Sequence, residues 1–469
     1  MAQLNRRNFL KIMGAATAAS LTPSLTFAQS ASLCSSQKKT LVLFHLGGGL
    51  HSLSLLPPRL LQEYFDKHPD TGITNSRPLT PQVGLNPACL SMYDIYTGQI
   101  PALAQAGVGV TFINQAGILR SDGREGNSRS HEDGTKQWNT ALMNPYGAEG
   151  SGFMGRYANR FCKNDGSELF NFVVLNGVPD AFTGPGITQV TASSLNTYGY
   201  TNDNFNTGAR TGVTAASSNR FVIESIRQAN DLQGPPANPG ADILRITNEN
   251  ADAAQASIQA ALAAYPAPPA GTYLANNPLN GRFQNAVALI NASARGIIPS
   301  LTGISLSQGG YDTHSGQGNG SLTNPTADPN LVNSYSGQLA RLLRQLDAGI
   351  GGFFRDLARL GLLNNALLAV TSEFGRTFEN NNTNQNGQPV HGTDHGTGGQ
   401  LTIIGPGVKN QVAYANYTGA HFTGRADWLP TEVDIRNVYS EIHEKFFGVD
   451  PSLFLSPDAY PKLNLGIFA

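Results

Sequence analysis

Short apolar runs that end in glycine or polar residues recur along the chain and limit the folds it can adopt. Lys39 to Leu46 (KTLVLFHL) runs into three glycines at 47–49, and Ala366 to Thr371 (ALLAVT) opens onto Ser372-Glu373. Similar runs occupy residues 108–114, 170–175, 303–306 and 401–404. Such runs predict buried strands, which are typical of an open, mainly parallel α/β sheet. His45 lies within the first run and is predicted to be a hydrogen-bonded core histidine.

The clearest predicted helix spans residues 335–360. Its apolar residues follow the i, i+3, i+4, i+7 spacing, namely Leu339, Leu342, Leu343, Leu346, Ile350, Phe353, Phe354 and Leu357. This spacing gives one apolar stripe, and Gly361 is a natural stop. Strands before and after the helix form the strand–helix–strand crossover of a parallel sheet. We therefore expect an α/β fold in which helices sandwich a mainly parallel sheet.

The pattern changes between residues 178 and 300. Residues 180–216 are rich in Gly, Thr and Asn and predict loop, whereas three later segments predict helices, at 217–232, 242–264 and 282–297. We interpret 178–300 as a helical and loop insertion within a single α/β domain that covers residues 38–469.

The N-terminus predicts export. The segment NRRNFLK at 5–11 precedes a mildly apolar stretch to Phe27 and a small-residue site that ends at Ala28. This order is that of a secretory signal, and paired arginines favour the twin-arginine route. We interpret residues 1–30 as the signal, with the twin-arginine machinery as partner and the periplasm or the exterior as destination. The segment is too short and polar for a membrane span, and no later apolar run approaches about 18 residues, so we expect no stable span after signal removal.

Charge and cysteine content narrow the function classes. Lys+Arg is 31 and Asp+Glu is 32, with a net charge of -1. This balance argues against a nucleic-acid partner, because binding to nucleic acid depends on neutralising phosphates. The three cysteines, Cys34, Cys89 and Cys162, have no zinc-ribbon spacing. One bridge, with Cys89–Cys162 as a candidate pair, is compatible with an oxidising periplasm, but the sequence does not determine it.

Residues of metal-ligand type concentrate just beyond the predicted strands. They lie in GLHS (49–52), SRSHED (128–133), GYDTH (310–314), SEFGR (372–376) and HGTDHG (391–396). The carboxyl ends of parallel strands share one edge of a sheet, where ligands bind. Imidazole and carboxylate together suit zinc, manganese or iron better than calcium. Two divalent ions held by such groups can clamp a phosphoryl or sulfuryl group.

Each of these residues also has a structural alternative. His51 could lie on the surface, and His314 could simply bond Asp312 within a turn. Glu373 at a strand end could be a helix N-terminal charge. Asp394 could orient its own loop. The repeated placement after strands favours the metal interpretation.

Six motifs, in this order, resemble an exported bacterial family known as domain of unknown function 1501. They are RRNFLK, LVLFHLGGGLHSLSLLPP, SRSHEDGTKQW, GYDTH, TSEFGRT and GTDHGTGG. The resemblance runs through roughly residues 38–445 and is weakest in the helical middle. That family is grouped with the alkaline phosphatase/sulfatase superfamily. The resemblance implies a mainly parallel sheet between helices, with metal ligands on loops beyond the strand ends.

The resemblance also implies roles for individual residues. One metal would be held by Asp312, His314 and His395, and a second would be surrounded by His51, Ser130 and Glu373. Ser130 is the candidate nucleophile, with Ser128 or a metal-bound water as alternatives. The candidate ligands are His51, Asp312, His314, Glu373, Asp394 and His395. The candidate catalytic residues are Arg129, Ser130, His131 and Arg376, of which either arginine could neutralise an anionic substrate.

Two departures from the family pattern affect the second metal. His51 stands where the family's GG-x-D-G-L motif has Asp, which changes the charge and the reach of the ligand. In the superfamily enzymes the TSEFG segment reads S-D-H-G, whereas this chain has Glu373 and Phe374. A ligand is lost at Phe374.

We therefore expect an exported metal-dependent hydrolase of small anionic phosphate or sulfate esters. Its cofactor would be one or two divalent ions, with zinc, manganese and calcium as candidates, and its nucleophile a Ser or metal-bound hydroxide. The alternative is a non-catalytic periplasmic binding or assembly protein with a degenerate metal site. A structural surface protein is a third hypothesis. A Ser-His-acid hydrolase and a P-loop enzyme are not supported, because the sequence has neither G-x-S-x-G at a strand-to-helix turn nor G-x-x-x-x-G-K-[ST].

Overall fold

The computed structural model describes residues 32–147, 150–162, 170–185, 187, 189–195, 253–378, 391–415, 417–423 and 428–469. The predicted signal at 1–30, the predicted helix at 217–232 and the first part of the one at 242–264 lie outside the described residues. Residues 253–264 are helical, as predicted. That 178–300 is an insertion remains a proposal.

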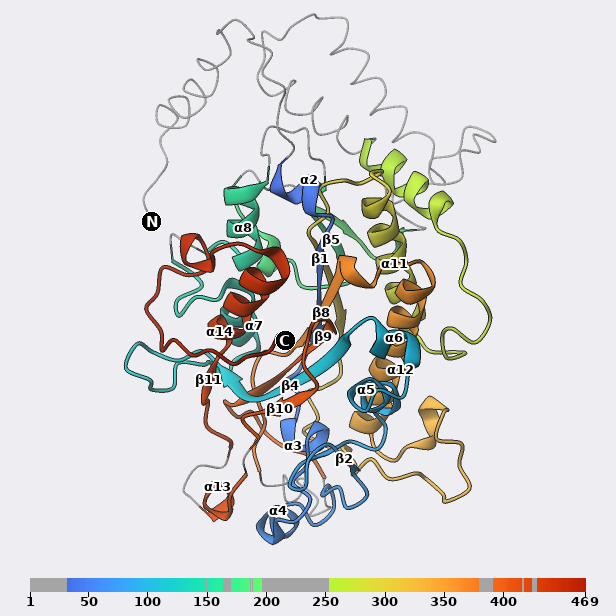
Figure 1. The fold of residues 1–469 in the computed structure, drawn as a ribbon. Coiled ribbons are helices and arrows are strands. Elements are labelled where there is room, and N and C mark those ends of the chain that lie inside the picture. The colour runs from blue at the N-terminus through green and yellow to red at the C-terminus, as the bar shows by residue number, and fades with distance from the viewer. Residues whose placement is uncertain are drawn as a thin grey trace, which may run out of the picture.

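A mixed sheet of nine strands forms the centre of the described structure (Figure 1). The strands are β1 (Thr40–Leu46), β4 (Val108–Gly117), β5 (Phe172–Leu175), β6 (Gln189–Ala192), β7 (Gly303–Gln308), β8 (Ala366–Thr371), β9 (Gly399–Pro406), β10 (Gln411–Ala413) and β11 (Val433–Asp434). Their order is β10-β4-β9-β8-β1-β7-β5-β6, with β11 paired to β4. β9 is antiparallel to β8 and β4, and the other pairings of this sheet are parallel. The mainly parallel sheet is therefore confirmed.

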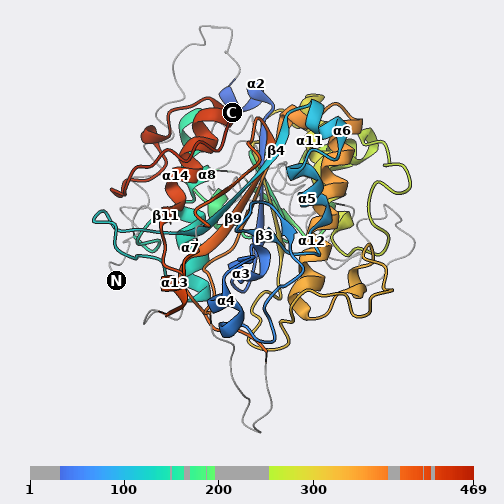
Figure 2. The same cartoon turned by 60° about the horizontal axis from the view of Figure 1, so that its bottom comes forward.

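Helices cover both faces of the sheet (Figures 1 and 2). One face carries α5 (Leu90–Tyr96), α6 (Pro101–Gln105), α11 (Asn280–Ala294) and α12 (Gln338–Arg359). The other carries α7 (His131–Thr140), α8 (Phe153–Phe161) and α14 (Ile435–Glu441), which continues as a π-helix over Ile442–Phe447. Short elements complete the fold: α2 (Leu33–Gln37), α3 (Ser52–Leu55), α4 (Gln62–Lys67), α13 (Gly419–Thr423), the hairpin of β2 (Arg77–Pro78) and β3 (Gly84–Leu85), and single 3-10 turns at Asp180–Phe182, Val332–Ser334, Leu363–Asn365 and Pro451–Leu453.

Alternation along the strands builds one core on each face. In β1, Val42 and Phe44 pack toward α11 and α12, whereas Leu41 and Leu43 pack toward α8 and α14. Burying each such side chain stabilises the fold by about 1.5–3 kcal/mol. The predicted helix at 335–360 corresponds to α12, and its apolar stripe faces the first of these cores.

The strand directions bring the ligand-type segments to one edge of the sheet. β8, β1 and β7 are parallel neighbours, so their carboxyl ends lie side by side. β4 runs in the same direction as β8, because both are antiparallel to β9. β9 consequently begins at the edge where the others end. The loops that follow β1, β7 and β8 and the loop that precedes β9 meet there.

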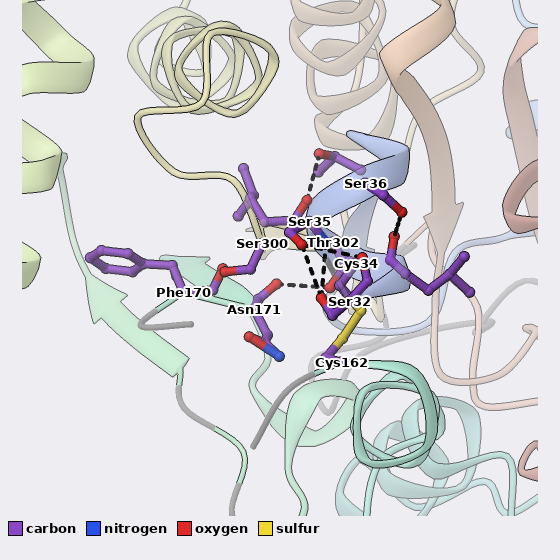
Figure 3. Close-up of a disulfide and its surroundings, with 12 residues drawn as sticks. Ser32, Cys34, Ser35, Ser36, Cys162, Phe170, Asn171, Ser300 and Thr302 are labelled. Atoms are coloured by element: carbon purple, nitrogen blue, oxygen red, sulfur yellow. Dashed lines mark hydrogen bonds between the residues drawn. A yellow bond between two sulfur atoms is a disulfide. The ribbon is translucent and has the colours of Figure 1, made fainter. Parts of the chain in front are cut away.

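A disulfide joins Cys34 in α2 to Cys162 at the end of α8, with a Cα–Cα distance of 5.2 Å (Figure 3). Cys89 is free and buried. The candidate pairing of Cys89 with Cys162 is therefore wrong. Cys89 packs in the core beneath α5 and α12, whereas Cys162 packs against the core on the opposite face of the sheet. Among the described residues, no helix combines the length and apolar character needed to cross a membrane.

Candidate metal centre

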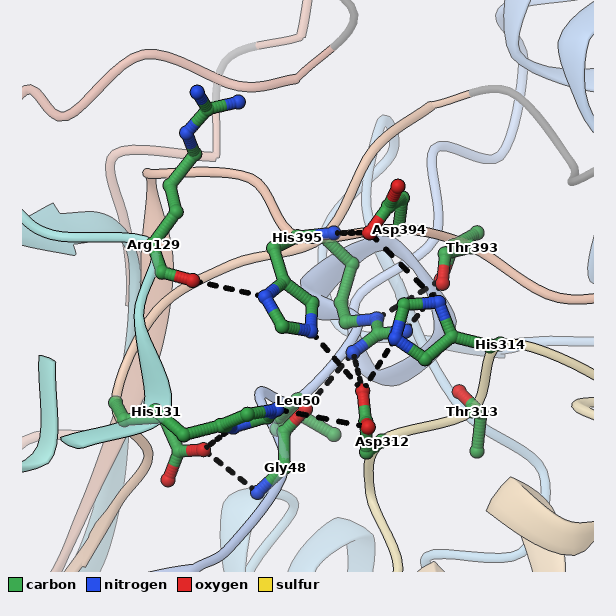
Figure 4. A network of polar contacts seen from close by, with 12 residues as sticks. Gly48, Leu50, Arg129, His131, Asp312, Thr313, His314, Thr393, Asp394 and His395 are labelled. Atoms are coloured by element: carbon green, nitrogen blue, oxygen red, sulfur yellow. Dashed lines mark hydrogen bonds and ion pairs between the residues drawn. The ribbon is translucent and has the colours of Figure 1, made fainter.

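Three histidines surround the carboxylate of Asp312 at the carboxyl edge of the sheet (Figure 4). Asp312 Oδ1 lies 3.0 Å from His314 Nε2 and 3.2 Å from His395 Nε2. Asp312 Oδ2 lies 3.5 Å from His131 Nε2. The four residues come from the loop after β7, the loop before β9 and the first position of α7. Segments far apart in the sequence thus meet at one carboxylate.

Gly48 allows the loop after β1 to reach this carboxylate. Its φ is +121°, and a Cβ at this position would lie 2.1 Å from the Asp312 backbone nitrogen. Residues with a side chain rarely adopt such a φ, and nothing larger than hydrogen fits at that distance. The glycine run that follows β1 therefore has a steric role in building the site.

Arg376 supports Asp312 from within the protein. Its fully buried guanidinium donates to Asp312 Oδ1 at 2.6 Å and to the Gly48 carbonyl at 2.9 Å, and it also bonds Thr393. Burial raises the pKa of Asp312, but the Arg376 guanidinium and the neighbouring imidazoles hold that pKa below its ordinary value. Asp312 is therefore an ionised acceptor, and Arg376 is engaged by the protein rather than turned toward solvent.

Glu373, a predicted metal ligand, lies on the other side of the His131 ring from Asp312. Its carboxylate accepts hydrogen bonds from His131 Nδ1 at 2.5 Å and from His45 Nε2 at 2.9 Å. Burial raises the pKa of Glu373, but these two imidazoles and the Gly48 amide hold it below its ordinary value. Phe374 is fully buried and packs against the rings of His131 and His395, with centroid distances of 5.1 and 4.5 Å. Its apolar ring therefore covers one side of both imidazoles.

The geometry of His131, Asp312 and His395 fits a divalent cation. One nitrogen of each ring and one carboxylate oxygen lie within 4.8 Å of one another. His395 Nε2 lies 3.2 Å from Asp312 Oδ1, and His131 Nε2 lies 3.5 Å from the other oxygen, Oδ2. Each distance is close to the spacing of about 3.3 Å between two ligands of a tetrahedral zinc ion. The other ring nitrogens are anchored, because His131 Nδ1 bonds Glu373 and His395 Nδ1 bonds the Arg129 carbonyl at 2.8 Å. Metal-binding histidines commonly show this arrangement.

His314 and Asp394 form a second, overlapping set with His395. His314 Nδ1 lies 3.7 Å from Asp394 Oδ1, and the atoms of the three residues again lie within 4.8 Å. Burial and the Arg376 charge lower the pKa of His314, although both neighbouring carboxylates oppose the shift. A neutral imidazole near pH 7 can bind a metal.

Three of the other predicted residues lie differently. His51 is buried, and its Nδ1 bonds Ser54 Oγ at 2.6 Å and the Gln317 amide at 2.9 Å; burial lowers the pKa of this ring well below its ordinary value. It is not brought to the cluster. Ser130 is the N-cap of α7, where its Oγ accepts from the Asp133 amide at 3.5 Å. The Arg129 guanidinium points away from the cluster (Figure 4) and lies 4.4 Å from the centroid of the Trp428 ring.

Sequence reasoning missed two contributors to the site. Thr135 donates to Glu373 Oε2 at 3.2 Å. Its i, i+4 spacing from His131 on a helix was an available signal. The Arg129 backbone carbonyl, which accepts a hydrogen bond from His395, could not be predicted, because a backbone contact does not depend on the type of residue. His45 is buried as predicted, and its partner is Glu373.

The fold and the cluster define a class: an α/β protein with an imidazole–carboxylate site on the loops at one edge of its sheet. The chain belongs to the family described as "Protein of unknown function (DUF1501)", which matches residues 126–455. Residues 3–23 match the twin-arginine translocation pathway signal, so the protein is exported to the periplasm or secreted through that machinery. Both predictions are confirmed. No curated protein matches this sequence significantly.

Several solved structures are similar in overall arrangement. Ps i-CgsB in complex with k-i-k-neocarrahexaose is 11% identical, with 90% of this chain and 75% of that chain covered and a TM-score of 0.34. The lipoteichoic acid synthase LtaP from Listeria monocytogenes is 7% identical, with 92% and 76% covered and a TM-score of 0.34. A protein in the alkaline phosphatase superfamily from Vibrio parahaemolyticus is 12% identical, with 88% and 71% covered and a TM-score of 0.29.

Proposed function

We propose that this protein is an exported metal-dependent hydrolase of phosphate or sulfate esters. One observation carries the proposal: two histidines have one ring nitrogen anchored by the protein and the other facing the same ionised carboxylate. A protein that only needed a surface ion pair would not anchor the far side of both rings. The side chains of His131 and Asp312 are 45% and 40% exposed, so a small anionic ester can reach them.

His131, Asp312 and His395 would hold the cation, and three protein ligands is the number typical of catalytic zinc. When bound there, such a cation would supply Lewis-acid chemistry, which polarises an ester oxygen and lowers the pKa of a water nucleophile. Two imidazoles and one carboxylate favour zinc or manganese, with calcium the weakest of the predicted candidates. Arg376 keeps Asp312 ionised, and Phe374 excludes water from beneath the rings.

Water is the preferred nucleophile, because the Ser130 hydroxyl caps a helix. His314 and Asp394 lie beside the proposed cation site as candidate proton carriers. Their side chains are 44% and 65% exposed.

The test is hydrolysis of a panel of nitrophenyl phosphate and sulfate esters by the purified protein. Turnover is expected to disappear after chelation, to return with Zn²⁺ or Mn²⁺, and to be absent in His395→Ala. His391→Ala is the matched control, because His391 pairs with Asp70 at 3.1 Å outside the cluster. A folded, metal-loaded protein that is inactive across the panel would contradict the proposal.

A second candidate function is a non-catalytic periplasmic binding or assembly protein. The observation that favours it is the engagement of predicted second-metal residues elsewhere, with His51 bonded to Ser54 and Glu373 to four donors. A natively purified protein without any bound transition metal would support this candidate against the hydrolase.

A further inference from the structure

The carboxylate of Glu373 is saturated with hydrogen bonds. Oε1 accepts from His131 Nδ1 at 2.5 Å and from the Gly48 amide at 2.9 Å. Oε2 accepts from His45 Nε2 at 2.9 Å and from Thr135 Oγ1 at 3.2 Å. A carboxylate offers about four lone-pair positions, and all of them are used. Glu373 therefore has no free oxygen for a cation.

The hydrogen-bond donors to Glu373 come from a strand, a loop and a helix. His45 lies in β1, Gly48 in the loop after it, and His131 and Thr135 lie one turn apart on α7. α7 approaches so closely that a Cβ on Gly134 would lie 2.6 Å from the Glu373 carbonyl oxygen. The carboxylate thus ties the first turn of α7 to the sheet edge, at the residue that faces Asp312.

The hydrogen bonds also specify the tautomer of His131. An ionised carboxylate can only accept, so the ring nitrogen facing Glu373 must carry the proton. Nδ1 is therefore protonated, and the lone pair of a neutral His131 ring lies on Nε2, which faces Asp312 Oδ2 at 3.5 Å. The same reasoning places a proton on His45 Nε2, and His45 Nδ1 is buried with no hydrogen-bond partner among the described residues. This pattern is that of a carboxylate–histidine–metal arrangement.

We infer that Glu373, held by His45, is a positioning residue that fixes His131 with Nε2 toward Asp312, and that the centre binds one cation rather than two. The inference rests on the proposed metal centre but not on catalysis. It assigns Glu373 a role beyond the predicted one, because it acts through His131 instead of binding the metal.

The count of one follows from His395. The two candidate sets found in the described part of the chain share this residue, and its Nδ1 is already bonded to the Arg129 carbonyl. Only Nε2 remains, so one set at a time can use it. Phe374 adds to the argument, since an apolar ring occupies the position after Glu373 and offers no ligand.

The test is Co²⁺ binding to the metal-free mature protein, measured by competition with a chromophoric chelator. Glu373→Gln and His45→Leu are expected to weaken binding by 10- to 100-fold, as is typical when a residue that orients a metal-binding histidine is changed. His45→Gln retains a donor at the Nε2 position and is expected to recover most of the affinity. Glu132→Gln is the control, because Glu132 is exposed on α7 and pairs with Lys136. Circular dichroism confirms that each variant is folded, and two different positions keep the test decisive if one variant fails to fold.

Nitrogen NMR of the metal-free wild type gives a second readout, which a purely structural role would not predict. His131 is expected to be the Nδ1–H tautomer. An Nε2–H tautomer, unchanged Co²⁺ affinity in folded Glu373→Gln, or two Co²⁺ per chain would each overturn the inference. One Co²⁺ with the expected variant responses but no ester hydrolysis would leave the inference standing and refute only the hydrolase. A wild type that binds no Co²⁺ would overturn both.

Discussion

Removal of the disulfide between Cys34 and Cys162 is expected to destabilise the protein by up to about 5 kcal/mol. The bridge joins residues with a sequence separation of 128. In the chain-entropy description, closing a loop of this size lowers the entropy of the unfolded chain by an amount equivalent to roughly 5 kcal/mol at 25 °C. The bridge anchors α2, which directly precedes the central strand β1. The assay is urea unfolding of the oxidised mature protein and of the double variant Cys34→Ser/Cys162→Ser, which is expected to unfold at a clearly lower urea concentration.

The free cysteine supplies the control. Cys89→Ala leaves the bridge intact and changes only local packing in the core. Oxidised wild-type protein, once denatured, should present one reactive thiol. Equal urea midpoints for the double variant and the wild type would show that the bridge does not stabilise the fold, and three reactive thiols in the oxidised protein would show that the bridge does not form.

Three further predictions concern other parts of the chain. Gly48→Ala is expected to lower stability by at least about 1–2 kcal/mol, because a non-glycine residue there is strained and its Cβ meets the Asp312 backbone. Gly47→Ala is the control and should be nearly neutral in thermal unfolding, because its Cβ meets nothing nearer than 3.9 Å. Equal melting temperatures for the two variants would contradict this prediction. Burial lowers the pKa of His443 from 6.5 to about 4. Its neutral form therefore contributes at most about 3 kcal/mol of stability above pH 6.5, and this stability is lost as the pH falls toward 4. The stability of His443→Leu in urea unfolding should vary less across that pH range than that of the wild type, and an equal pH dependence in the two proteins would contradict this prediction. Ser130→Ala is expected to lose about 1 kcal/mol of stability with its cap and to keep most ester hydrolysis, whereas an inactive but folded variant would show Ser130 to be the nucleophile.

Much of the fold could be predicted from local patterns. Short buried strands and the amphipathic α12 each satisfy one physical rule within a few residues, so β1, β8 and α12 appear where expected. The antiparallel direction of β9 could not be predicted, because an apolar run reads alike in both directions. The Cys34–Cys162 pairing depends on which face of the sheet α2 and α8 cover, and the sequence does not state this.

The site shows the same division. The rule that ligands gather beyond parallel strand ends correctly brings Asp312, His314 and His395 together. It cannot separate a proposed ligand from a residue that positions it, and the proposed roles of Glu373 and His131 depend on hydrogen bonds made after folding. His51 stands where the family has an aspartate, and the sequence does not determine which way its ring points. In the structure the ring bonds the buried Ser54 hydroxyl.

In the proposed site, His131, Asp312 and His395 hold a single divalent cation. The most direct measurement is elemental analysis by mass spectrometry of the mature protein purified from its native periplasm. One zinc or manganese ion per chain is expected in the wild type, and none in a folded Asp312→Asn variant. No cation above background in the wild type, or the same content in both proteins, would contradict it.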